Sequence, residues 1–167
     1  MRYRLDIVGV DVLDVVQHAG GWLFDRAVAG WDVTVLVADL ADARPLRILG
    51  AEVLELESVL ATGGRGRQPH ALAIASEVLA ADTRTHRGLV KALDDGGMEV
   101  VVWGESWPPP PEHRIEPVVH RLSVAAQAFK AQALAAAGVP AVPGEVEVFR
   151  SGLSAFPPVG ADLSPVG

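Results

Sequence analysis

The sequence predicts a three-layer α/β domain with a mostly parallel, five-stranded sheet of the flavodoxin-like or Rossmann-like kind. Short apolar segments rich in Val, Leu and Ile alternate with segments of helical periodicity along most of the chain. The strand-like segments are continuous apolar runs, which is typical of strands covered by helices on both faces. Aromatic residues make up only 5% of the 167 residues, so aliphatic side chains must form most of the core.

The first half of the chain predicts alternating strands and helices. An apolar strand at residues 4–10 leads into a helix that Asp11 caps and Gly30 ends. Pro45 and Gly50 bracket a second, shorter helix, with proline at its start and glycine after its end. Two further strands are expected, at residues 32–38 and 51–56. Because strand–helix–strand connections are right-handed crossovers, this alternation predicts parallel strands.

The second half of the chain predicts longer helices. Pro117 is placed in the first turn of the longest helix and Gly138 just beyond its end. One domain is expected over residues 1–150, and residues 151–167 form a Pro/Gly-rich C-terminal tail without a periodic pattern. The expected elements are helices at residues 70–81, 83–95 and 116–137, and strands at residues 98–103 and 145–149.

Composition excludes several classes of function. The formal net charge of −7 argues against nucleic-acid binding, which draws its affinity from clustered Lys and Arg. The absence of cysteine excludes disulfides, thiolate catalysis and cysteine-ligated metals. No apolar run approaches the roughly 20 residues that span a membrane, and the N-terminal segment lacks the features of a signal peptide. We therefore expect a cytoplasmic protein that binds no nucleic acid and no membrane.

A ligand is expected at the carboxyl ends of the parallel strands, where ligands of open α/β sheets bind. The loop from Gly63 to Arg67 can present bare amides and two guanidinium groups to a phosphate or carboxylate. It is not a phosphate-binding Walker loop, because it contains no Lys and follows the third predicted strand. The candidate ligand-binding residues are Asp11, Glu57, Gly63, Gly64, Arg65, Arg67, Glu105, Ser106 and Trp107.

The motifs for common catalytic chemistry are incomplete. Ser106 follows a strand as in a hydrolase nucleophile elbow, but Pro108 stands where that elbow needs a second glycine. His113, Glu116 and His120 have the composition of a metal site, but the expected helix start at Pro117 separates them. His18, His70 and His86 have no adjacent acid–base partner in the sequence. The sequence therefore identifies no catalytic residue, no metal site and no cofactor.

The leading hypothesis is a non-catalytic binding or regulatory module that recognises a protein partner or a small ligand at the strand carboxyl ends. One alternative is a small enzyme or nucleotide-binding protein acting on a phosphate- or carboxylate-bearing metabolite. A second alternative is a structural assembly subunit. A homodimer through the long helix or the fifth strand is a further hypothesis, prompted by the apparent lack of a final helix to cover the sheet.

Overall fold

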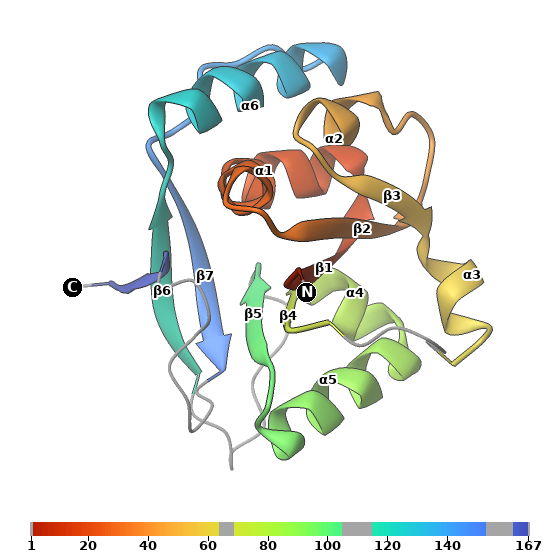
Figure 1. Cartoon of the computed structure of the whole chain (residues 1–167). Coiled ribbons are helices and arrows are strands. Elements are labelled where there is room, and N and C mark those ends of the chain that lie inside the picture. Colours follow the sequence, from red (N-terminus) through yellow and green to blue (C-terminus); the bar gives the residue numbers. More distant parts are fainter. Residues whose placement is uncertain (1, 64–68, 105–114, 153–161, 167) are drawn as a thin grey trace.

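The structure is a computed structural model that describes residues 2–63, 69–104, 115–152 and 162–166. Within this part of the chain, eight strands form one sheet in the order β3-β2-β1-β4-β5-β7-β6-β8 (Figure 1). The first five in this order are parallel, and the last three pair antiparallel with their neighbours. The strands are β1 Arg4–Asp11, β2 Asp32–Asp39, β3 Glu52–Glu55, β4 Ala71–Ala75, β5 Glu99–Trp103, β6 Ile115–Arg121, β7 Val146–Gly152 and β8 Ser164–Pro165.

Helices cover both faces of the sheet, which confirms the predicted three layers (Figure 1). One face carries α1 Val12–Val28, α2 Arg44–Ile48 and α6 Val124–Ala136, which also contact one another. The other face carries α3 Leu56–Leu60, α4 Ser76–Ala81 and α5 Thr83–Asp95. Among the described residues, no helix is both long and apolar enough to traverse a lipid bilayer.

The prediction of five strands is wrong, because three strands lie in segments expected to be helical or without structure. The Ala-rich segment of β4 has helical composition, but it is buried between β1 and β5 and pairs with both. β6 occupies the start of the expected long helix and pairs with β7 over its whole length. β8 is a two-residue strand beside β6. The mostly parallel arrangement is confirmed, whereas the flavodoxin-like or Rossmann-like class stays a prediction.

Residues 162–166 lie within the segment expected as a tail and contact the body of the domain. β8 pairs with β6 through Val118 and Val119. The Asp162 carboxylate accepts hydrogen bonds from Arg26 at 2.7 and 2.8 Å and from Trp22 Nε1 at 3.0 Å. These contacts attach the segment to α1 and to the edge of the sheet.

Gly21 allows α1 to approach the start of α6 closely. A Cβ atom on Gly21 would overlap the Leu122 side chain, whereas one on Gly20 would lie 3.2 Å from Leu49 Cδ1. We expect Gly21→Ala to lower the free energy of unfolding by about 1–3 kcal/mol, because the added methyl group overpacks the interface. Gly20→Ala is the matched control and should be neutral or stabilising by up to about 1 kcal/mol, since alanine favours a helix. Urea unfolding measures both, and equal effects would contradict this interpretation.

Candidate functional site

The order of the parallel strands reverses between β1 and β4, and ligands of open α/β sheets bind outside the strand carboxyl ends at such a reversal. Asp11 ends β1 at this position, and its Oδ1 accepts a hydrogen bond from the Asp14 backbone N–H at 2.8 Å. The predicted role of Asp11 as the N-cap of α1 is therefore confirmed. The cap fixes the start of α1. Asp14, in the first turn of this helix, lies beside Trp103 at the end of β5.

Three donors from different elements hold the Asp14 carboxylate. Its Oδ2 accepts the Val10 backbone N–H at 3.0 Å, and its Oδ1 accepts the Trp103 Nε1–H at 3.2 Å. His18 Nδ1 lies 3.1 Å from Oδ1 and 2.9 Å from the Asp14 carbonyl oxygen. The Asp14 side chain is only 17% exposed, so the position of this carboxylate is well defined by its surroundings.

His18 lies in the second turn of α1, beside Asp14 and Trp103. Its ring is half exposed and stacks on the Trp103 indole, with ring centroids 6.3 Å apart and planes 14° apart. In the tautomer that donates from Nδ1 to Asp14, Nε2 is the nitrogen that can take up and release a proton. An oriented imidazole beside a buried carboxylate is the arrangement that general acid–base catalysis uses.

The contact between Asp14 and His18 shifts the pKa values of both residues. The hydrogen bond to Asp14 raises the pKa of His18 above its ordinary value of 6.5, although burial of the ring opposes this. Burial alone would raise the pKa of Asp14, but the hydrogen bonds from His18, Val10 and Trp103 bring it below 3.8. At neutral pH Asp14 is therefore ionised, and His18 is poised to exchange a proton.

A hollow of about 400 Å³ lies beside Trp103, at the end of β5. It is lined by Val102, Trp103, Gly104, Val148, Phe149 and Arg150. The Arg150 guanidinium donates a hydrogen bond to the Gly104 carbonyl oxygen at 2.7 Å. Gly104 has a φ of +91°, and a Cβ there would overlap the buried Ser76 hydroxyl, so this turn requires glycine. A cationic side chain therefore borders the hollow beside Trp103, the residue that also contacts Asp14 and His18.

The structure disperses the predicted ligand-binding residues that it describes. Glu57 lies in α3 and forms a two-pronged ion pair with Arg84, with N–O distances of 3.1 and 2.7 Å. Gly63 follows α3 with a φ of +68°. Asp11 is the one predicted residue that the structure places beside Asp14. Six further candidates lie outside the described residues: Gly64, Arg65, Arg67, Glu105, Ser106 and Trp107.

The expectation that His18 lacks an acid–base partner is wrong. Asp14 stands four residues earlier in the same helix, and residues at this spacing are neighbours on a helix surface. This spacing is visible in the sequence and could have identified the pair. The contribution of Trp103 could not be found in this way, because 89 residues separate it from Asp14.

No group of three or more His, Asp or Glu side chains converges on a metal position in the part of the chain that the structure describes. His120 instead binds Asp25 Oδ2 through Nε2 at 2.8 Å and the Asp162 carbonyl oxygen through Nδ1 at 3.0 Å. Residue 113, the other histidine of the metal site weighed from the sequence, lies outside the described residues.

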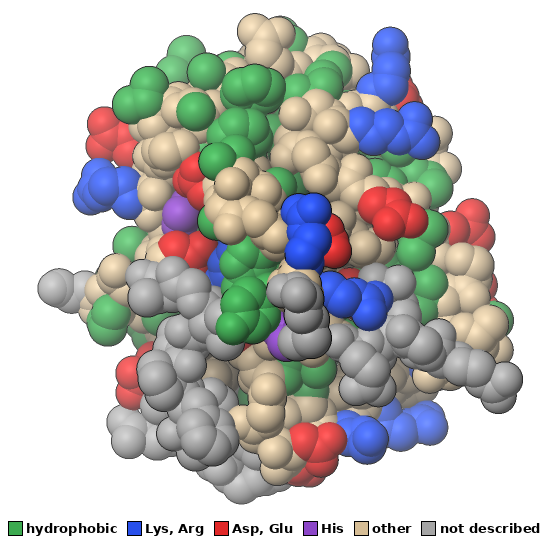
Figure 2. Space-filling view, in the orientation of Figure 1, with side chains coloured by type: hydrophobic (Ala, Val, Ile, Leu, Met, Phe, Trp, Pro, Cys, Tyr) green, Lys and Arg blue, Asp and Glu red, His purple; other side chains and the backbone are tan. Residues whose placement is uncertain are grey.

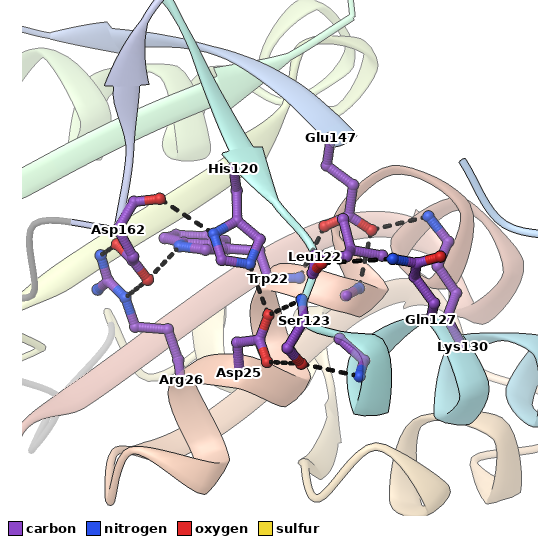
Figure 3. Close-up of polar contacts among 12 residues, drawn as sticks. Trp22, Asp25, Arg26, His120, Leu122, Ser123, Gln127, Lys130, Glu147 and Asp162 are labelled. Carbon is purple, nitrogen blue, oxygen red and sulfur yellow. Dashed lines mark hydrogen bonds and ion pairs between the residues drawn. The ribbon is translucent and has the colours of Figure 1, made fainter. Parts of the chain in front are cut away.

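A buried charged pair, Glu147 and Lys130, contacts α1 (Figure 3). Glu147 reaches α1 from β7 and accepts the backbone N–H groups of Gly21 at 2.8 Å and Trp22 at 2.7 Å. Lys130 comes from α6 and donates to Glu147 Oε2 and to the Gln17 carbonyl oxygen, both at 2.7 Å. These contacts hold the turn of α1 that carries His18 between β7 and α6.

No family model and no curated protein matches the sequence. Solved structures share the fold over nearly the whole chain. The A40926 pseudoaglycone deacetylase Dbv21 is 13% identical, with a TM-score of 0.64, and the match covers 94% of this chain and 100% of that one. A deacetylase of the teicoplanin biosynthesis pathway is 11% identical, with a TM-score of 0.67 and coverage of 91% and 98%. GalB, the 4-carboxy-2-hydroxymuconate hydratase of Pseudomonas putida KT2440, is 14% identical, with a TM-score of 0.58 and coverage of 97% and 100%.

These likenesses establish a fold that the chain shares with enzymes. The deacetylases and the hydratase contradict the leading hypothesis of a non-catalytic binding or regulatory module. That hypothesis rested on broken sequence motifs, and a pair such as Asp14 and His18, which the fold assembles, does not need any of those motifs. The enzyme alternative agrees better with the structure.

Proposed function

We propose that the chain is an enzyme that adds water to a small anionic substrate, with His18 as the acid–base residue and Asp14 as the residue that orients it. The observation that carries this proposal is the partly buried Asp14 carboxylate, which contacts the half-exposed His18 and accepts a hydrogen bond from Trp103 at the strand carboxyl ends. The named activities of the structural neighbours support it, because deacetylation and hydration both consume a water molecule.

In this mechanism His18 Nε2 takes a proton from water as the water oxygen bonds to an electrophilic carbon of the substrate. Asp14 stabilises the imidazolium that forms. His18 then returns the proton, to the departing amine nitrogen in a hydrolysis or to the neighbouring carbon in a hydration. Arg150 borders the adjacent hollow and is proposed to bind the anionic group of the substrate.

Five sequence-derived candidates outside the described residues are retained as proposed substrate contacts: Arg65, Arg67, Glu105, Ser106 and Trp107. If the anionic group of the substrate reaches the loop after α3, the Arg65→Ala and Arg67→Ala variants should show a higher KM. Alanine substitutions of Glu105, Ser106 and Trp107 test the segment that follows β5 in the chain. Unchanged KM values in all of them would remove these residues from the site.

Replacing His18 with Gln is expected to lower kcat/KM by about 10²–10⁴-fold, the usual contribution of general acid–base catalysis. The assay measures amine release from N-acetylated amino acids and amino-sugar phosphates, and hydration of unsaturated dicarboxylates by loss of ultraviolet absorbance. His86→Gln, in α5 on the opposite face of the sheet, is the matched control and should retain the wild-type rate. Wild-type turnover that survives in His18→Gln, or no turnover of any of these substrates, would contradict the proposal.

The rate should depend on pH through His18. Because the Asp14 hydrogen bond raises the pKa of His18 above 6.5, the basic form accumulates only above that pH, and kcat/KM should rise with a midpoint there. Asp14→Asn removes the charge and should move the midpoint to lower pH while reducing the rate. Histidine titration by NMR checks the same shift without any substrate. An unchanged His18 titration in Asp14→Asn would rule out the coupling.

The homodimer stays a prediction. β6 pairs with one edge of β7 along its whole length, whereas β5 pairs with the other edge only at Arg150, Ser151 and Gly152. Val124 and Phe129 of α6 are exposed, so the helix offers a second surface for a dimer. Analytical ultracentrifugation that finds only monomer at high micromolar concentration would exclude it.

A further inference from the structure

We propose that the groove between α3, α5 and the sheet binds a small amphiphilic anion, with medium-chain carboxylates as the ligand class. The groove has a volume of about 620 Å³, within the range of small-molecule sites. It lies on the opposite face of the sheet from α1, so it is separate from the Asp14–His18 pair. Its apolar lining includes Val8, Leu36, Leu56, Val59, Ile74 and Leu89.

Gly88 keeps the groove open. It lies in the interior of α5 and lines the groove, and a Cβ atom there would meet nothing within 4 Å. Glycine in a helix interior is less favourable than alanine, and no positive φ requires it at this position. Gly88 is therefore a position on the groove-lining part of α5 where a larger side chain has room.

The α5 wall also contains a buried hydroxyl without a hydrogen-bond partner. Thr85 lines the groove and is 7% exposed, and its Oγ1 has no partner among the described residues. Buried hydroxyls are nearly always hydrogen-bonded, so this group needs an explanation. Rotation about the Cα–Cβ bond of Thr85 would present the hydroxyl to a ligand oxygen.

The charges around the groove favour an anionic head group at its rim. Arg84, Arg87 and Lys91 follow one another at helical spacing along the groove side of α5. Basic side chains are visible beside α5 at the lower right of Figure 2. Arg84 is neutralised by Glu57 and Asp82, whereas Arg87 forms no ion pair in the described part of the chain.

The floor of the groove is mainly apolar. Val8, Leu36 and Ile74 line it from the sheet, whereas the basic side chains belong to α5. The ligand is therefore expected to place its hydrocarbon part against the sheet and its anionic group near Arg87.

Calorimetric titration with octanoate, below its critical micelle concentration, tests this proposal. Octanoate should bind with one-to-one stoichiometry, and octylammonium, with the same chain and the opposite charge, should bind at least about tenfold more weakly. Gly88→Leu fills the groove with a helix-favouring side chain and should abolish binding. Arg87→Gln should weaken binding by about tenfold, a change typical of one lost charge contact.

Arg47→Gln, an exposed arginine in α2 on the other face, is the control for the change in net charge and should bind octanoate like the wild type. Circular dichroism and thermal unfolding establish that each variant is folded. Equal affinity for octanoate and octylammonium, unchanged binding by Gly88→Leu, or no heat of binding in the wild type would each overturn the proposal. None of these outcomes depends on catalytic activity.

Discussion

Replacing Lys130 with Met is expected to lower the free energy of unfolding by about 3–5 kcal/mol, the cost of breaking a buried ion pair by removing one partner. The Lys130 and Glu147 side chains are 7% and 2% exposed, and their charged atoms are 2.7 Å apart. Methionine keeps the apolar stem of lysine but leaves the Glu147 carboxylate buried without its counter-ion. Urea unfolding followed by tryptophan fluorescence measures the change.

Two variants separate this effect from a general loss of charge. Lys91→Met removes a lysine that is 80% exposed and lies 3.9 Å from Asp95, and it should cost less than about 0.5 kcal/mol. Adding Glu147→Gln to Lys130→Met removes the buried charge and should restore part of the stability. Recovery should be incomplete, because the glutamine amide matches the two backbone donors of α1 less well than a carboxylate. A Lys130→Met cost as small as that of Lys91→Met would contradict the role assigned to the pair.

The same variant links the buried pair to the candidate site. The pKa of His18 is raised mainly by its hydrogen bond to Asp14, and the charge of Lys130 acts in the opposite direction. Removing the Lys130 charge should therefore raise the pKa of His18 further. NMR titration of His18 reports this shift, and a decrease would show that the turn of α1 had moved away from Asp14.

The elements that the sequence predicted well are those whose patterns act locally. The strands at residues 4–10 and 32–38 and the helix at residues 83–95 match the structure within one residue. β4 and β6 were missed, because their strand conformation depends on distant partners. Ala71–Ala75 favours a helix by composition, and only burial between β1 and β5 makes it a strand. β6 depends on pairing with β7 across a segment of more than twenty residues.

The candidate site also has one part that depends on local sequence and one part that depends on the fold. Asp14 and His18 form a local pair that helical spacing alone could reveal. Their connection to Trp103 and to the hollow near Arg150 depends on which strands are neighbours, and periodicity does not specify strand order. The sequence therefore located the strand ends at which a ligand should bind, but not the side chains that the fold brings together there.

Replacing Arg26 with Met is expected to cost about 3–5 kcal/mol at neutral pH, because it leaves the buried Glu99 carboxylate and the partly buried Asp162 carboxylate without their counter-ion. Arg26 is 1% exposed and lies between Trp22 and Trp31, with its guanidinium carbon 4.7 and 4.3 Å from their ring centroids. It pairs with Glu99 at 2.9 Å and with Asp162 at 2.7 Å. Loss of Arg26 thus removes two ion pairs and the cation between two indole rings.

The loss of stability in Arg26→Met should become smaller as the pH falls. Burial raises the pKa of Glu99 above its ordinary 4.5, although attraction to Arg26 opposes the rise. Without Arg26 that opposition is lost, so the folded variant binds a proton on Glu99 more tightly than the unfolded chain does. Stability relative to the wild type is therefore recovered as the pH falls through the raised pKa. At neutral pH, Glu99→Gln in the Arg26→Met background should recover part of the loss, since no charge then remains at residue 99.

Arg2→Met is the exposed control for this series. Arg2 and its partner Asp32 are 62% and 54% exposed, so their separation should change stability by less than about 0.5 kcal/mol at any pH. A penalty for Arg26→Met that stays constant between neutral and acidic pH would show that Glu99 carries no unpaired charge in the variant. In that case the loss would arise from packing between Trp22 and Trp31, because a lost packing contact does not titrate.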